Sequence, residues 1–269
     1  MSFRRWRPRD FLYYLHCQGE DVESAKRGLA HQYPDYRELT MGHFEIALVA
    51  ATDTEARQVL HGMRKHCGVA HPIGQRHWGR HHFTALGLNQ NWPRRRFDEL
   101  HWLNTTASGT TPWERLSESA DTVHIHHFAP PGPVLQIPAR HYQWRSRQDL
   151  VSFWASLYLA REGPCIPGLD WSSYANWSTG ASLGHASVGR GATPAAAVAA
   201  LLAQTEPAVL GNAVHALLVI EANHSLTLGD YASILELLGT AIGCEVIATG
   251  YLSANYADHA LRLLAFGPG

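Results

Sequence analysis

The stretch Phe44-Glu-Ile-Ala-Leu-Val-Ala-Ala-Thr-Asp-Thr-Glu-Ala56 decides the fold class, because an apolar run of strand length passes directly into a turn and a helical pattern. A strand that ends in a turn and opens a helix points backbone N–H groups at an anion, and glycines let a phosphate approach that turn closely. This turn contains no glycine, and Asp53 and Glu55 complement the helix dipole themselves. The stretch therefore predicts the architecture of a nucleotide-binding protein whose nucleotide site has been lost.

Composition sets the size and the general class of the protein. The chain has 269 residues, of which 45% are hydrophobic and 17% charged, so we expect two packed units. A net charge of −1 disfavours nucleic acid as a partner, because such partners require a broad basic face. The chain has no run of 18 apolar residues, and its four cysteines are far apart and follow no secretory pattern. We therefore expect a cytoplasmic protein with reduced thiols.

Residues 1–10 form a basic arm that contains Arg4, Arg5, Arg7 and Arg9. Phe3 precedes these arginines and Trp6 lies among them, and such a pattern can contact an anionic membrane surface or an acidic partner. A solvated terminus without a partner is the alternative.

The first half of the chain alternates between predicted strands and helices. Apolar runs predict strands over residues 11–15, 44–49, 83–88 and 122–126, and apolar spacings of three and four predict helices over 53–66 and 147–161. This alternation favours a parallel sheet covered on both faces. Residues 89–115 contain three tryptophans in an irregular pattern, which suits a contact surface or core packing equally.

The second half begins with a glycine-rich tract over residues 181–191. An alanine-rich helix follows with Thr193 as its N-cap, then a strand over 215–221 and a helix over 227–242 capped by Thr227. Strands over 245–252 and 259–266 are joined by a polar link that suits a hairpin. We expect a sheet backed by helices on one face.

The order of these elements resembles that of the FtsZ/tubulin family, most clearly over residues 165–267. The tract at 181–191 and the segments 216–220, 225–228 and 261–267 follow the order of the family's C-terminal domain. Upstream, residues 83–96 and 116–125 are similar to family segments. The resemblance implies an α/β protein with a reduced parallel-sheet, nucleotide-binding-type domain at 11–146, a central helix at 147–163, and a second α/β domain of FtsZ C-terminal type at 164–269.

The resemblance also implies where GTP would bind. The family's glycine-threonine loop, G-G-T-G-T-G-A, aligns with residues 50–56, which keep Thr52 and Thr54 but no glycine. Gly19 remains from a second glycine-rich turn of the family. Cβ atoms and carboxylates therefore stand where backbone would meet phosphate, and we expect no bound cofactor.

A family loop that places two acids against the neighbouring subunit's nucleotide matches residues 167–174. Asp170 fits the first acid, but Ser173 stands at the second, and a hydroxyl is a poor substitute for a carboxylate that orients water. The resemblance thus implies a structural or regulatory subunit that self-assembles or binds an active FtsZ-like partner, without robust GTP hydrolysis. A GTP-binding, filament-forming GTPase with atypical loops is the alternative.

Histidine is frequent, with 18 residues. His124 and His126 alternate along a predicted strand and so face the same side, where a third ligand from residues 77–82 would complete a metal site. A histidine-ligated metal enzyme is therefore a second alternative. Strand or surface histidines, or a pH-sensitive interface, explain the same pattern without a metal.

Overall fold

The computed structural model describes residues 44–70, 81–105, 112–130, 137, 139–162, 182–252 and 256–268. From Glu45 onward the chain forms one compact unit. The predicted strand at 11–15, Gly19, the basic arm and the loop with Asp170 and Ser173 lie outside the described residues. Within the described ranges, no helix is long and apolar enough to cross a membrane.

The described residues form a nine-stranded sheet in the order β2-β1-β3-β4-β5-β6-β9-β7-β8. The pairs β1–β3, β3–β4, β4–β5, β5–β6 and β7–β8 are parallel, whereas β9 runs antiparallel to β6 and β7. The strands are β1 (Phe44–Ala50), β2 (His81–Gly87), β3 (Phe97–Asn104), β4 (Ala120–His127), β5 (Arg140–Gln143), β6 (Ser182–Gly191), β7 (His215–Ala222), β8 (Val246–Leu252) and β9 (His259–Pro268).

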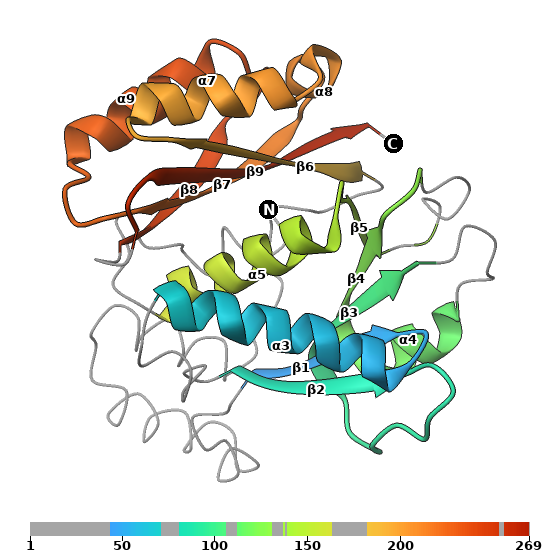
Figure 1. The fold of residues 1–269 in the computed structure, drawn as a ribbon. Helices are drawn as coiled ribbons and strands as arrows, with labels where there is room; N and C mark the ends of the chain where they lie inside the picture. Colours follow the sequence, from blue (N-terminus) through green and yellow to red (C-terminus); the bar gives the residue numbers. More distant parts are fainter. Residues whose placement is uncertain are drawn as a thin grey trace, which may run out of the picture. The chain divides into compact units, whose positions relative to one another are not determined.

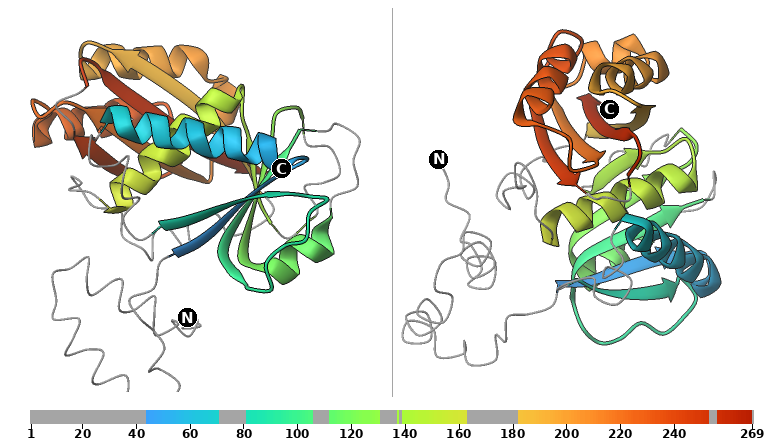
Figure 2. Two further views of the ribbon diagram at one scale, coloured as in Figure 1. Left: turned by 60° about the horizontal axis from the view of Figure 1, so that its bottom comes forward. Right: turned by 60° about the vertical axis from the view of Figure 1, so that its left-hand side comes forward.

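Helices cover both faces of this sheet. Figure 1 shows α5 (Arg147–Glu162) between the C-terminal strands and the layer that contains α3 (Asp53–Ala70). The opposite face of the C-terminal strands carries α7 (Pro194–Gln204), α8 (Pro207–Gly211) and α9 (Leu228–Gly239), as Figure 2 also shows. The short helix α4 (Trp113–Ser119) packs over a separate apolar cluster that includes Trp102 and Ile125. The mixed α/β fold class predicted from the sequence is confirmed.

Both predicted helix caps are present. The Thr193 side chain accepts a hydrogen bond from the Ala196 N–H, and Thr227 forms a reciprocal capping box with Asp230. The alanine-rich helix and the helix after Thr227 therefore begin where the sequence places their caps. The second of these helices ends at Gly239, three residues before the predicted end at 242.

The predicted hairpin between the last two strands is wrong. β8 pairs in parallel with β7, and β9 lies between β6 and β7. Burial explains this order, because Leu261, Leu263, Leu264 and Phe266 of β9 are all fully buried. A strand inside the sheet can bury its own side chains on both faces, as β9 does. The edge strand β8, in contrast, begins with half-buried residues.

The prediction of an irregular segment over residues 89–115 is also wrong. This segment contains β3, seven of whose eight residues are buried, and Trp102 is part of the core. Asp98, Glu99 and His101 interrupt the apolar run that would have marked this strand. The backbone N–H of Glu45 donates to the Asp98 carboxylate at 2.9 Å, so one of these buried polar groups is paired with the neighbouring chain segment.

Candidate functional site

The turn after β1 is closely packed against the end of β2. The Leu88 N–H donates to the Ala50 carbonyl at 3.0 Å, which brings the ends of these two strands together. A Cβ atom on Gly87 would lie 2.7 Å from the backbone nitrogen of Asp53. Only glycine fits there, so the end of β2 approaches the backbone of this turn closely.

Thr52 and Thr54 lie together at the start of α3, and both are exposed. The Thr52 hydroxyl accepts a hydrogen bond from the Glu55 N–H at 3.2 Å, and the Thr52 carbonyl accepts from the Ala56 N–H. Thr52 is therefore the N-cap of α3. Its hydroxyl occupies a backbone donor that a phosphate at this helix end would otherwise use.

The two carboxylates of the turn have basic partners. Glu55 forms an ion pair with Arg147, the first residue of α5, and Asp53 pairs with Arg57 one turn along α3 at 3.3 Å. Arg57 is largely exposed, so the second pair contributes little to stability. The Glu55 carboxylate therefore links the N-terminal end of α3 to the start of α5.

A group of buried histidines lies on the α5 side of β3 and β4. His101 and His124 are directly paired across the two strands, and their rings stack with centroids 4.4 Å apart. The His126 ring stacks on His101 at 5.2 Å, so His124 and His126 do share one face. Their neighbour is His101, which sequence reasoning missed together with β3. His82 lies elsewhere and pairs with Glu45, and His77 is outside the described residues.

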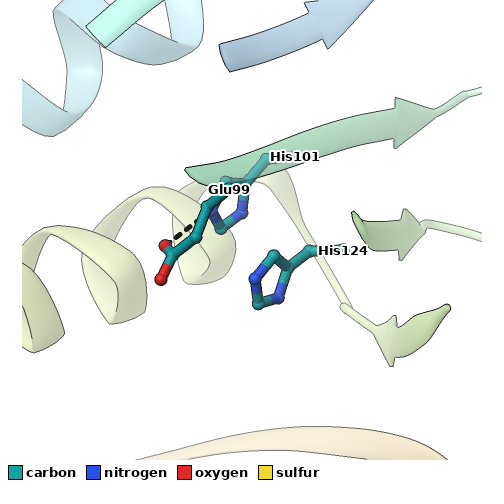
Figure 3. A group of neighbouring side chains, drawn as sticks. All are labelled: Glu99, His101 and His124. Atoms are coloured by element: carbon teal, nitrogen blue, oxygen red, sulfur yellow. Dashed lines mark ion pairs between the residues drawn. The ribbon is translucent and has the colours of Figure 1, made fainter. Parts of the chain in front are cut away.

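Glu99, His101 and His124 have the donor atoms of a metal site. Figure 3 shows these side chains projecting from the two strands toward a common space, and one ligand atom from each lies within 4.8 Å of the others. All three residues are buried. A carboxylate with two imidazoles is a zinc-binding set, so the remaining question is which nitrogens carry protons.

Hydrogen bonds settle the protonation of this cluster. The Trp144 Nε1–H can only donate, and it donates to His126 Nδ1 at 3.0 Å. The proton of neutral His126 therefore lies on Nε2 and is donated to His101 Nδ1 at 2.9 Å. His101 in turn carries its proton on Nε2, which donates to the Tyr158 hydroxyl at 2.8 Å, and Tyr158 donates to Glu99 at 3.0 Å.

This chain, which runs from Trp144 through His126, His101 and Tyr158 to Glu99, is named the histidine chain below. Burial, followed by the electrostatic effect of the neighbouring histidines, holds the pKa of His126 well below its ordinary value, consistent with a neutral His126 ring. A metal ion bound at His101 Nε2 would have to displace the proton from that nitrogen. If this proton moved to Nδ1 of His101, His126 would have to change its tautomer, and its hydrogen bond from Trp144 would be broken. The three residue types are those that bind zinc, but hydrogen bonds occupy both ring nitrogens of His101, so this residue is not available as a ligand.

Two further buried histidines, His127 at the end of β4 and His141 within β5, form a hydrogen-bonded group with Asn104 at the end of β3. His141 donates from Nε2 to the Ile137 carbonyl at 3.0 Å and so accepts at Nδ1 from His127, also at 3.0 Å. The Asn104 amide completes this chain at His127 Nδ1. Burial, and then the neighbouring His141, lowers the pKa of His127 to about 4.

A buried ion pair joins the C-terminal strands to α5. Arg262 of β9 donates to the Glu221 carboxylate of β7 at 2.8 Å and to the Ser152 hydroxyl of α5 at 2.7 Å. The other Glu221 oxygen lies 2.9 Å from His66 of α3 and accepts a hydrogen bond from Ser156. Burial alone would raise the pKa of Glu221, but Arg262 and His66 outweigh it and lower the pKa to about 2.

Solved structures similar to this chain include a CetZ from Methanosaeta thermophila. The two share 14% sequence identity with a TM-score of 0.50, and the match covers 81% of this chain and 85% of that one. The fold is of the FtsZ/tubulin type. An FtsZ dimer from M. jannaschii is similar at 14% identity and a TM-score of 0.44, over 63% of this chain and 54% of the FtsZ chain. This chain thus spans about half the length of that FtsZ, and its sequence matches no family model and no curated protein.

The structure shows where the described members of the predicted site residues lie, and the roles of all of them stay predictions. Thr52 and Thr54 share one turn at the end of a parallel strand, and the buried His124 and His126 lie on a sheet face covered by α5. Asp170, Ser173 and Gly19 lie outside the described residues, so their roles stay predictions.

Proposed function

We propose that this protein is an FtsZ/tubulin-like structural or regulatory subunit that assembles with itself or with an active FtsZ-like partner, without robust GTP hydrolysis. The fold supports the assembly role, because head-to-tail contacts between identical subunits leave open ends that can grow or be capped. The observation that carries the pseudo-GTPase part is the start of α3, where the Thr52 hydroxyl and the Glu55–Arg147 ion pair stand in place of a glycine loop.

The physical argument concerns the anion that this turn can accept. Phosphate binding at a helix start needs open N–H groups and a close approach of the backbone. Here one N–H is capped, every turn residue carries a Cβ atom, and the two carboxylates at the helix start already hold the arginines Arg57 and Arg147 that an anion would need. Ser173 in place of a second acid would weaken hydrolysis separately, even if a nucleotide were bound.

Calorimetric titration of the full chain with GTP and Mg²⁺ tests the nucleotide part. We expect no saturable binding. Micromolar GTP binding that Thr52→Ala abolishes would overturn the pseudo-GTPase proposal in favour of the GTPase alternative. Thr240→Ala is the matched control, because Thr240 is also exposed and also hydrogen-bonds at a helix end, in α9.

Sedimentation and negative-stain microscopy test the assembly part. We expect ordered assemblies of the protein alone, or co-sedimentation with filaments of an active FtsZ, that do not require GTP. If the protein stays monomeric, does not sediment and does not join FtsZ filaments, the proposed assembly role is wrong.

We also propose that the basic arm contacts an anionic membrane. Four arginines within six residues are each worth about 1 kcal/mol at an anionic surface. Vesicles with phosphatidylserine should pellet the protein, and phosphatidylcholine vesicles should not. A variant with glutamine at Arg4, Arg5, Arg7 and Arg9 should stay in solution, and equal pelleting of this variant would exclude the arm as the contact.

A further inference from the structure

A pocket of about 290 Å³ lies at the carboxyl ends of β4 and β5. Its walls come from residues 128–130 after β4, residues 143–145 at the end of β5, residues 185–187 of β6 and the segment around Glu206 before α8. Ligands of α/β sheets bind outside the carboxyl ends of parallel strands. The pocket shares no lining residue with the turn of Thr52 and Thr54, so it is a separate place for a ligand.

Two lining residues are fixed by hydrogen bonds. The Trp144 backbone N–H donates to the His127 carbonyl at 2.9 Å, and its indole N–H donates to His126. The hydroxyl of Thr205, another lining residue, donates to the Leu201 carbonyl at 2.8 Å. Because these contacts hold the walls in place, a ligand would not have to order them on binding.

Neutral polar side chains line one part of the pocket. Gln143 and His185 are direct neighbours across β5 and β6, and Ser187 follows two residues later on the same face of β6. Burial lowers the pKa of His185, and the Glu206 carboxylate acts in the opposite direction. An amide, an imidazole and a hydroxyl together offer hydrogen-bond donors and acceptors without a net charge.

Two opposite charges, Arg145 and Glu206, complete the lining. Arg145 donates to the Gln204 carbonyl at the end of α7, which leaves other guanidinium N–H groups available. In the part of the chain that the structure describes, no ion pair joins Arg145 to Glu206, and the Glu206 carboxylate has no hydrogen-bond partner. The pocket therefore presents a cation and an anion that do not neutralise each other directly.

We propose that this pocket binds a small zwitterion, namely a free α-amino acid, with its carboxylate at Arg145 and its ammonium group at Glu206. Gln143, His185 and Ser187 then contact the amino-acid side chain and select among amino acids. The volume is at the lower end of the usual range of ligand pockets, about 300–1,000 Å³, which suits a molecule of this size. Guanidinium and carboxylate groups are the natural partners of the two charges of the ligand.

The test measures thermal unfolding of the full chain with each of the twenty L-amino acids, followed by calorimetry for those that raise the midpoint. We expect saturable binding of one or a few of them. The N-acetyl and methyl ester derivatives of the same amino acid, each lacking one charge, should bind at least about tenfold more weakly. Glu206→Gln and Arg145→Gln should weaken binding similarly, whereas the exposed controls Glu236→Gln and Arg190→Gln should not.

Three results would overturn the proposal: no binding by any of the twenty amino acids, equal binding of both derivatives, or undiminished binding by Glu206→Gln. The ligand-free midpoints from the same experiment show whether each variant is folded. If Arg145→Gln unfolds because it loses the Gln204 contact, Glu206→Gln still decides, since among the described residues the Glu206 carboxylate has no hydrogen bond or ion pair to lose and only its charge acts on His185.

Discussion

Replacing Glu221 by glutamine removes the anion of the buried ion pair but keeps a side chain of nearly the same shape. Arg262 and Glu221 are each only 1% exposed, so the guanidinium would be left charged and buried without its counter-ion. Loss of one partner of a buried pair costs about 3–5 kcal/mol. We therefore expect Glu221→Gln to lower the free energy of unfolding by about 3–5 kcal/mol, measured by urea denaturation monitored by circular dichroism.

The pKa of Glu221 gives an independent magnitude for the same effect. The lowering from 4.5 to about 2 corresponds to about 3 kcal/mol of preferential stabilisation of the ionised carboxylate in the folded state. Because the folded pKa lies below the unfolded pKa, this stability is fully present above pH 4.5 and is lost as the pH falls toward 2. The difference between wild type and Glu221→Gln should therefore shrink across this pH window.

A double variant separates the pair from the packing around it. Glu221→Gln with Arg262→Met removes both charges, and such replacements of buried pairs are often neutral or stabilising. We expect the double variant to be more stable than Glu221→Gln alone. If Glu221→Gln lies within about 1 kcal/mol of wild type at neutral pH, or if the double variant is the less stable of the two, the ion pair does not stabilise the fold as argued.

Three further predictions concern other buried positions. Trp144→Phe should cost about 1–3 kcal/mol, because His126 Nδ1 loses its donor, and ¹⁵N chemical shifts should show that the His126 ring is no longer held in one tautomer. His127 alone should account for a loss of about 3 kcal/mol of wild-type stability as the pH falls from 6.5 to about 4, because it protonates first in the unfolded chain; His127→Gln should lack this share in urea titrations across that range. Gly189→Ala should destabilise by at least about 1–3 kcal/mol in thermal unfolding, since its Cβ would lie 2.2 Å from the Ala197 carbonyl oxygen. Gly239→Ala, with no atom within 4 Å, should leave the midpoint unchanged or slightly raised.

The sequence predicts those parts of the fold in which local signals agree with burial. The cap at Thr193 precedes a proline at the first helical position, and the cap at Thr227 precedes Asp230, so both helix starts follow from neighbouring residues. β1 and β7 are apolar runs bounded by polar residues, and both were predicted within one residue at each end. The order of such elements was enough to indicate the FtsZ/tubulin-type fold.

The parts that were missed depend on contacts between distant segments. β3 carries Asp98, Glu99 and His101, which break the apolar pattern, and the partners that permit their burial come from β1, β4 and α5. Similarly, β8 and β9 follow one another in the chain, which suits a hairpin. Only the burial of β9 on both faces explains why it lies next to β6. No window of sequence contains this information.

For the candidate site, the sequence identified residue types but not their partners. The prediction that His124 and His126 share a face followed from strand periodicity alone, whereas His101 became visible only once β3 was placed beside β4. The tautomer that argues against a metal is set by Trp144, which is 18 residues from His126 in the chain. The sequence shows which residues could provide a metal ligand atom, but tertiary contacts determine whether that atom carries a proton.

Buried polar contacts on two sides of α5 give this helix a role beyond filling space. Tyr158 connects it to the histidine chain of the N-terminal strands, whereas Ser152 and Ser156 connect it to Arg262 and Glu221 of the C-terminal strands. Apolar side chains tolerate sliding and rotation, but a buried hydrogen bond is lost when its partner moves by little more than an ångström. The rotation and the axial position of α5 are therefore specified by both sets of bonds, and with them the angle between the two groups of strands. In a subunit that contacts its neighbours at both ends, this angle sets the direction in which an assembly grows. If the protein assembles as proposed, variants that remove Tyr158 or the Ser152 hydroxyl should change the geometry of the assemblies before they abolish them.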